Sequence, residues 1–177
     1  TDSKADVLNY FEMIPAVHKL GTGGYDGRGV QMIGTVADID KAFDGPGVLE
    51  KCIDFQTEIS VIVARNERGE VMTYPSVELS FHPEENLVEF LFSPANISKE
   101  IEVKAQELAI EVITKLGMVG LLAIEMFLDK RGELLVNEVA PRTHNSGHHT
   151  IEANQTSQFE QHLRAVLNLP LGITKML

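Results

Sequence analysis

Two apolar segments joined by a short polar turn constrain the fold of this chain more than any other feature. The segments cover residues 119–128 and 133–139, and Asp129-Lys-Arg-Gly132 separates them. Apolar runs of this length around a turn that ends in glycine predict two antiparallel strands forming a hairpin. A central hairpin of this kind favours a fold built on antiparallel sheets over a doubly wound parallel one.

Each strand of this hairpin carries one glutamate among apolar neighbours, Glu125 in AIEMF and Glu138 in LVNEV. If Asp129 pairs with Gly132, Glu125 faces Val136 and the two glutamates lie on a cross-strand diagonal, with Cα atoms roughly 7–8 Å apart. Both carboxylates then point to the same face of the sheet. An odd loop without a bulge would send them to opposite faces.

A shared face would let Glu125 and Glu138 bind one cation. Charged groups are rarely buried unpaired, and Mg²⁺ takes one or two carboxylates and completes its shell with water and substrate phosphates. The pattern therefore indicates a metal–nucleotide site. The alternative is a solvated sheet face with two surface glutamates.

The rest of the chain reads as further short strands with few helices, which predicts an α+β fold. Strands are expected at 14–19, 30–33, 47–53, 58–65, 71–74, 77–81 and 87–92. Helices are expected at 37–43, from the cap at Ser98 to Gly117, and at about 157–167. A change in composition near Gln56 predicts a small lobe, residues 1–55, and a larger lobe, residues 56–177.

Composition limits the function. The 177 residues are 44% apolar, enough for a sizeable core. A net charge of −11 argues against nucleic acid or an anionic membrane as partner. The longest apolar stretch, 117–128, is too short to span a bilayer. The single cysteine, Cys52, suits a reducing compartment, which favours the cytoplasm. No signal-peptide pattern opens the chain. Because it starts at Thr1 without a methionine, it could be a piece of a longer protein.

A glycine-rich hairpin at residues 21–29 is a candidate phosphate-binding loop. Its glycines are in the reverse order of GxGxxG, and it leads into a strand instead of a helix. Glycine still lets backbone N–H groups approach phosphate oxygens closely. Lys19 and Arg28 bring positive charge, and Tyr25 and Asp26 lie at the centre. The alternative is a mobile surface hairpin.

A polar segment directly follows the second glutamate strand, where binding residues often lie. Arg142 can hold a phosphate or carboxylate through two hydrogen bonds. His144, Asn145 and Ser146 offer hydrogen bonds or proton transfer. The segment therefore indicates substrate binding.

Three other interpretations of this segment stay open. His144, His148 and His149 could bind zinc, although two are adjacent and no HExxH helix is present. Ser146 with a histidine could act as a hydrolase nucleophile, although the GxSxG elbow is missing. The segment could also be a histidine-rich loop that only covers the sheet.

Taken together, these motifs resemble the ATP-grasp superfamily and, within it, the 5-(carboxyamino)imidazole ribonucleotide synthases. The resemblance covers nearly the whole chain. It is carried by GGYDGRG at 23–29, VLEKCIDF at 48–55 followed by EISVIVAR, NEVAPRTHNSGHHT at 137–150 and SQFEQHLRAVLNLPLG at 157–172. It implies an ATP-grasp fold, with two lobes that have mainly antiparallel sheets and packed helices.

The resemblance also implies roles for individual residues. The phosphates would be bound by Lys19 and covered by the loop Gly24, Tyr25, Asp26, Gly27, Arg28 and Gly29. Adenine would meet Glu50, Lys51, Cys52 and Ile53, the ribose would meet Glu58, and His82 would be a further nucleotide contact. Mg²⁺ would be held by Glu125 and Glu138, with Asn137 beside them. Bicarbonate, carboxyphosphate or the ribonucleotide would be held by Tyr25, Arg142, His144, Asn145 and Ser146.

The implied activity is the ATP-dependent carboxylation of 5-aminoimidazole ribonucleotide with bicarbonate, through carboxyphosphate, in purine biosynthesis. ATP and Mg²⁺ would be the cofactors, and the full-length enzyme could be a homodimer. Enzymes of this family have further domains on both sides, so we expect this chain alone to be deficient in activity. The alternatives are another ATP-grasp ligase, such as formate-dependent glycinamide ribonucleotide transformylase, or a non-catalytic nucleotide-binding module.

Overall fold

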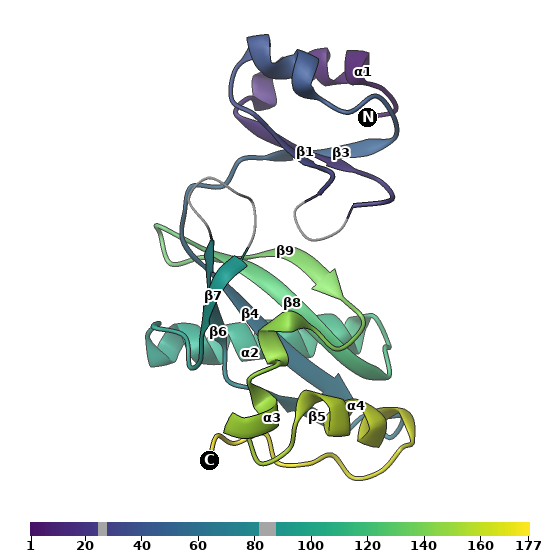
Figure 1. Cartoon of the computed structure of the whole chain (residues 1–177), viewed down its shortest axis with the longest axis vertical. Helices are drawn as coiled ribbons and strands as arrows, with labels where there is room; N and C mark the ends of the chain where they lie inside the picture. Colours follow the sequence, from purple (N-terminus) through teal and green to yellow (C-terminus); the bar gives the residue numbers. More distant parts are fainter. Residues whose placement is uncertain (25–27, 82–87) are drawn as a thin grey trace. The chain divides into compact units, whose positions relative to one another are not determined.

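The computed structural model describes residues 1–24, 28–81 and 88–177. Its described part falls into two compact units, one formed by residues 1–54 and the other by residues 55–81 and 88–177 (Figure 1). Each unit has its own sheet and its own hydrophobic core.

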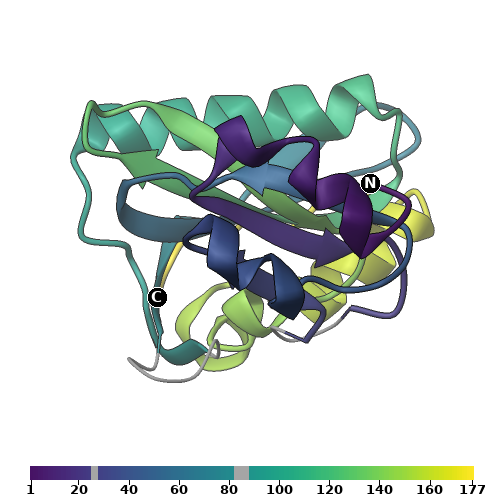
Figure 2. The ribbon, with the colours of Figure 1, turned by 90° about the horizontal axis from the view of Figure 1, so that it is seen from above.

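The N-terminal unit is a three-stranded antiparallel sheet in the order β2-β1-β3. Its strands are β1 (Ala16–Leu20), β2 (Val30–Ile33) and β3 (Gly47–Lys51). Its helices are α1 (Lys4–Leu8) and the 3₁₀ helices η1 (Phe11–Met13) and η2 (Val36–Lys41). The helices lie over one face of the sheet (Figure 2). The core below them contains Val7, Ile33 and Ala42.

The C-terminal unit is built on a six-stranded antiparallel sheet in the order β7-β6-β4-β8-β9, with β5 also paired to β4. The strands are β4 (Phe55–Arg65), β5 (Val71–Thr73), β6 (Val77–Phe81), β7 (Val88–Phe92), β8 (Gly120–Asp129) and β9 (Leu134–Ala140). The helices are α2 (Lys99–Lys115), η3 (Asn145–Gly147), α3 (Thr150–Ala153) and α4 (Gln158–Val166).

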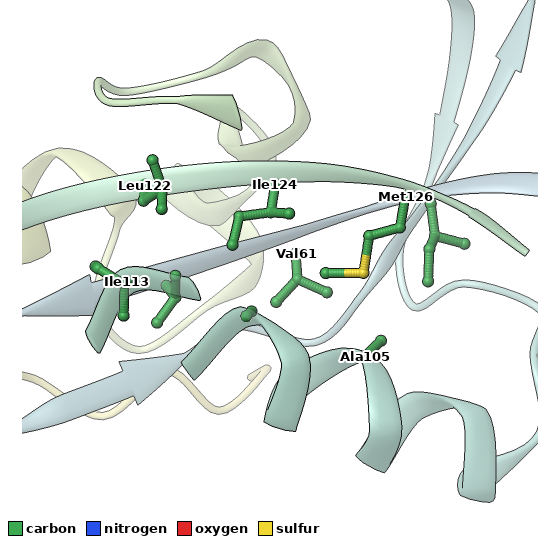
Figure 3. Close-up of a cluster of buried hydrophobic side chains, with 9 residues drawn as sticks. Val61, Ala105, Ile113, Leu122, Ile124 and Met126 are labelled. Carbon is green, nitrogen blue, oxygen red and sulfur yellow. The ribbon is translucent and has the colours of Figure 1, made fainter. Parts of the chain in front are cut away.

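The helix α2 covers one face of this sheet and buries the main core (Figure 3). Alternation along β4 points Ile59, Val61 and Val63 toward α2. The N-terminus of α2 is capped by the Ser98 hydroxyl, which accepts from the Ile101 N–H at 3.2 Å. Gly117, at φ +60°, follows the helix in a conformation that glycine adopts at low cost.

The opposite face of the sheet carries a second, smaller core and the polar side chains described below. Its buried members are Ile62, Ala64, Tyr74, Leu121, Ala123 and Ala140. The helix α4 packs against β4 and β8. No helix in the described part of the chain has the length and apolar character needed to cross a membrane.

The predicted α+β class with antiparallel sheets is confirmed, and the described strands start or end within three residues of their predicted limits. The helix predicted at 37–43 is the 3₁₀ helix η2. Two short helices, α1 and α3, were not predicted. With five and four residues they are too short to show a helical repeat of apolar residues.

The predicted register of the glutamate hairpin is wrong. Asp129 N–H donates to the Glu133 carbonyl at 2.9 Å, so Asp129 lies opposite Glu133 and not opposite Gly132, whose N–H donates to the Asp129 carbonyl at 3.0 Å within the turn. A β-bulge then lies between Glu125 and Met126, so that Glu125 pairs directly with Glu138. A loop of three residues, 130–132, would by itself place Glu125 and Glu138 on opposite faces of the sheet. The extra residue of the bulge shifts the register by one and returns both glutamates to the same face.

Candidate functional site

Three polar residues stand side by side on the sheet face opposite α2. Ser60 of β4 pairs with Glu125 of β8, which in turn pairs with Glu138 of β9. Directly paired residues of adjacent strands point to the same face, with Cα atoms roughly 4.5–5.5 Å apart. Direct pairing therefore brings the Cα atoms of the two glutamates closer together than the diagonal arrangement predicted from the sequence.

The same face holds a second polar pair, Glu58 and Asn137. Glu58 lies two residues before Ser60 on β4 and is buried. The Asn137 amide Nδ2 donates to Glu58 Oε1 at 3.0 Å. Asn137 is the extra residue of the bulge in β9, between Val136, which pairs with Met126, and Glu138, which pairs with Glu125. The bulge thus adds an amide to the carboxylate face as well as aligning Glu125 with Glu138.

The loop after β9 brings His144 and Ser146 onto this face. The His144 ring nitrogen Nδ1 lies 3.0 Å from Ser146 Oγ, and Nε2 lies 3.6 Å from Glu125 Oε1. Ser146 is fully buried, and its hydroxyl lies 2.9 Å from Ser60 Oγ. We call Ser60, Ser146 and His144 the serine–histidine network. It connects the interior of β4 to one of the two paired carboxylates.

Buried Gln158, the first residue of α4, holds this loop in place. Its Oε1 accepts from the His144 backbone N–H at 2.9 Å, and its Nε2 donates to the His144 carbonyl at 2.8 Å. Gln158 N–H donates at 2.8 Å to Thr150 Oγ1, which itself donates to the Gly147 carbonyl at 2.6 Å. Two backbone hydrogen bonds from one amide fix both the position and the orientation of the His144 peptide.

The other predicted residues of this loop have different surroundings. Arg142 is exposed and donates from Nη1 to the Thr143 carbonyl at 3.0 Å. Asn145 is exposed and begins η3. Both side chains are thus accessible to a ligand from solvent.

The three histidines of the loop do not converge. The His148 ring stacks on Phe159, with centroids 6.1 Å apart. Burial lowers the pKa of His149 from its ordinary value. Within the described ranges, no group of three or more His, Cys, Asp or Glu side chains could hold a metal ion. A divalent cation at Glu125 and Glu138 would therefore complete its shell with water and ligand oxygens, which is the usual arrangement for Mg²⁺.

The N-terminal unit holds the predicted phosphate and adenine residues. On the sheet face away from its helices, Lys19 lies opposite Val30 and Val48. The Lys19 ammonium is 2.8 Å from the Glu50 carboxylate. Met32, Val30 and Val48 are exposed on this face, at 50%, 36% and 53%. The face combines one cation with an apolar surface, which suits a flat aromatic ring and a phosphate chain.

Other predicted residues of this unit lie elsewhere. Lys51 pairs with Ala16, so its side chain emerges on the opposite face from Lys19. Cys52 and Ile53 follow β3 and are partly buried. The structure describes both ends of the glycine-rich hairpin. Gly29 has φ +80°, and a Cβ added to it would lie only 3.1 Å from the Cα of Gly24, so the close approach of the two ends requires glycine at position 29. Arg28 is exposed. Tyr25, Asp26, Gly27 and His82 lie outside the described residues.

Two residues of the site were not predicted, Ser60 and Gln158. The sequence held a signal for Ser60, because it falls two residues after Glu58 and on the opposite face from the apolar residues of β4. Gln158 had no such signal, because its partners are backbone groups of a distant loop.

The fold and this site define a known class of protein. The family model described as ATP-grasp domain matches residues 2–159, and the chain belongs to the ATP-grasp family. Within that family, it is similar to the N5-carboxyaminoimidazole ribonucleotide synthase of Bacillus subtilis, with 47% identity over 168 residues. The match covers 93% of this chain and 44% of that protein. It is also 44% identical to the chloroplastic phosphoribosylaminoimidazole carboxylase of Vigna aconitifolia, over 86% of this chain and 28% of that protein.

The chain is also similar to solved structures of the same group of enzymes. An ADP complex of an N5-carboxyaminoimidazole ribonucleotide synthetase has a TM-score of 0.91 at 39% identity, covering 99% of this chain and 48% of that one. The Aspergillus clavatus enzyme with ADP and 5-aminoimidazole ribonucleotide has a TM-score of 0.86 at 34% identity, covering 97% and 46%. The chain thus spans less than half the length of these relatives.

Proposed function

We propose that this chain supplies the Mg-ATP site and part of the substrate site for the ATP-dependent carboxylation of 5-aminoimidazole ribonucleotide with bicarbonate. The products would be 5-(carboxyamino)imidazole ribonucleotide, ADP and phosphate. The observation that supports it most is the direct pairing of Glu125 with Glu138 on a sheet face that also carries Glu58 and Asn137. The Bacillus subtilis relative is named as a synthase of N5-carboxyaminoimidazole ribonucleotide, and the Aspergillus clavatus structure is a complex with ADP and 5-aminoimidazole ribonucleotide.

In this proposal the residues of the N-terminal unit hold the nucleotide. Lys19 neutralises phosphate charge, and the apolar side chains beside it contact adenine together with the segment Glu50–Ile53. The glycine-rich hairpin, residues 24–29, covers the phosphates with backbone N–H groups. Glu58 of the C-terminal unit accepts hydrogen bonds from the ribose hydroxyls, and Asn137 keeps its carboxylate in position. His82 stays a predicted nucleotide contact.

Glu125 and Glu138 would ligate Mg²⁺ in this proposal, and the donor set fits, since both are hard oxygen ligands on one face. The cation would supply charge neutralisation for the phosphates during attack by bicarbonate. Arg142, His144, Asn145 and Ser146, with Tyr25, would hold bicarbonate, the carboxyphosphate formed from it, or the ribonucleotide. Catalysis would then rest on positioning and on excluding water from the labile acyl phosphate.

Further parts of the proposal concern the whole protein. Because the chain is less than half of its relatives, we expect the chain alone to bind Mg-ADP and to turn over poorly. We place the protein in the cytoplasm, in line with its single cysteine and the purine pathway. A homodimer of the full-length enzyme stays a prediction.

Two measurements test the proposal. Calorimetry of the chain with Mg-ADP should show binding that Glu138→Gln weakens, and binding that is indifferent to this change would contradict the metal assignment. The full-length protein should release ADP only when bicarbonate and 5-aminoimidazole ribonucleotide are both present. Turnover with formate and glycinamide ribonucleotide instead would identify a different ATP-grasp ligase.

A further inference from the structure

Ser60 is a buried polar residue that the proposed function leaves without a role. Its side chain lies in the middle of β4, is 1% exposed and stands next to Glu125 in the strand register. The following residues on the same face of β4, Ile62 and Ala64, are apolar. Burying a hydroxyl among such neighbours is unfavourable unless it is hydrogen-bonded. The partner of Ser60 is Ser146, at 2.9 Å.

The serine–histidine network has a defined direction. The Ser146 backbone N–H donates to His144 Nδ1 at 3.4 Å, so Nδ1 of the neutral ring is an acceptor. The Ser146 hydroxyl, 3.0 Å from the same nitrogen, must then donate to it as well. Ser146 Oγ is left as an acceptor for the hydroxyl of Ser60. The ring proton is accordingly on Nε2, which faces Glu125 Oε1 at 3.6 Å.

We propose that Ser60 is a positioning residue that orients the Ser146 hydroxyl and, through it, holds the His144 ring with Nε2–H toward the Glu125 carboxylate. The role of Glu125 as a ligand rests on the proposed function. Partners one step removed from a metal fix the orientation of its ligands, and their loss costs roughly 10- to 100-fold in metal affinity or activity. His144 is such a partner of Glu125, and Ser60 lies two hydrogen bonds further away, through Ser146, so we expect an effect at the lower end of that range.

The first test uses the ring nitrogens of His144 in the chain without any ligand. Long-range ¹H–¹⁵N spectra distinguish the two neutral tautomers, and the wild type should show a protonated Nε2 and a hydrogen-bonded Nδ1. Ser60→Ala should shift the Nδ1 resonance, and Ser60→Thr, which keeps the hydroxyl, should restore it. Unchanged His144 resonances in folded Ser60→Ala would overturn the proposal.

A matched control separates the network from the general cost of altering a buried serine. Ser76 is fully buried, and its hydroxyl has no hydrogen-bond partner in the described part of the chain. Ser76→Ala should leave the His144 resonances unchanged, and an equal shift there would overturn the specificity of the network. If Ser60→Ala does not fold, Ser60→Cys replaces it, because a thiol is only a weak hydrogen-bond donor, with the same expected shift of the Nδ1 resonance.

The second test measures cation binding, with Mn²⁺ as the probe in the presence of ADP and electron paramagnetic resonance as the readout. Ser60→Ala should weaken Mn²⁺ binding roughly tenfold, and Ser60→Thr should recover it. Absence of Mn²⁺ binding in the wild type would overturn the proposed function and the metal part of this inference. If Ser60→Ala shifts the His144 Nδ1 resonance but binds Mn²⁺ with the affinity of the wild type, the proposed link from Ser60 to Glu125 is overturned.

Discussion

Gln158 should be important for the site because it holds the His144 backbone, although no ligand contact is predicted for Gln158 itself. Replacing it by methionine keeps the shape and length of the side chain and removes both hydrogen bonds to the His144 backbone. A typical hydrogen bond contributes about 0.5–1.5 kcal/mol, and a buried group left unpaired costs about 1–3 kcal/mol. With two partly buried groups affected, we expect Gln158→Met to lower the free energy of unfolding by about 2–4 kcal/mol.

The chain provides a matched control for this variant in Gln161, on the same helix. Gln161 is also fully buried and also binds one backbone residue twice, with Nε2 donating to the Gly172 carbonyl at 2.9 Å and Oε1 accepting from its N–H at 2.7 Å. Gln161→Met should therefore destabilise the chain by a similar amount. Only Gln158→Met should alter the loop of His144.

Urea denaturation measures the stability of both variants, and the His144 ring resonances report on the site. Both variants should lose stability to a similar extent, while only Gln158→Met should shift the His144 resonances and weaken Mg-ADP binding. A Gln158→Met protein as stable as the wild type would refute the hydrogen-bond argument. Equal disturbance of His144 by both variants would refute the claim that Gln158 acts locally.

Three further predictions concern the metal site, the loop packing and pH. Glu138→Gln should weaken Mg-ADP binding by more than roughly tenfold in calorimetry, since it removes a direct ligand; equal affinity would contradict this. Gly147→Ala should cost about 1–3 kcal/mol in urea denaturation, because the added methyl overlaps Ile62 and Gln158, whereas Gly34→Ala, with its nearest contact at 3.5 Å, should cost less. Burial lowers the pKa of His18 from 6.5, so the unfolded chain binds this proton more readily and stability should fall as pH drops below 6.5. The urea midpoint of His18→Met should therefore fall less between pH 6.5 and lower pH than that of the wild type. Midpoints of the two proteins that change in parallel with pH would contradict this prediction.

Local patterns predicted the elements of the fold well, because each is set by neighbours in the sequence. The alternation in β4 separates the apolar residues under α2 from Glu58 and Ser60 on the other face. Ser98 and Gly117 mark the limits of α2 through capping and backbone conformation. These signals depend on residues within about one turn or one strand, so the sequence shows them directly.

The register of β8 and β9 could not be predicted in this way. The turn at Asp129 is fixed by the carboxylate, whose Oδ1 accepts from the Arg131 and Glu133 N–H groups at 2.8 and 2.9 Å. These hydrogen bonds lower the pKa of Asp129, with that from Glu133 the largest cause. They select an odd loop. The bulge at Asn137 then compensates, and its amide finds Glu58, 79 positions away in the sequence.

By itself, the sequence determined the antiparallel α+β class, the strand that carries each glutamate and the residue types available for a cation and a nucleotide. Tertiary structure alone decided that Glu125 and Glu138 pair directly, that Gln158 holds the His144 backbone, and that Ser60 reaches His144 through Ser146. The reason is physical: strand and helix formation depend on short-range periodicity, whereas hydrogen bonds between distant segments form only after packing has brought their donors and acceptors within about 3 Å.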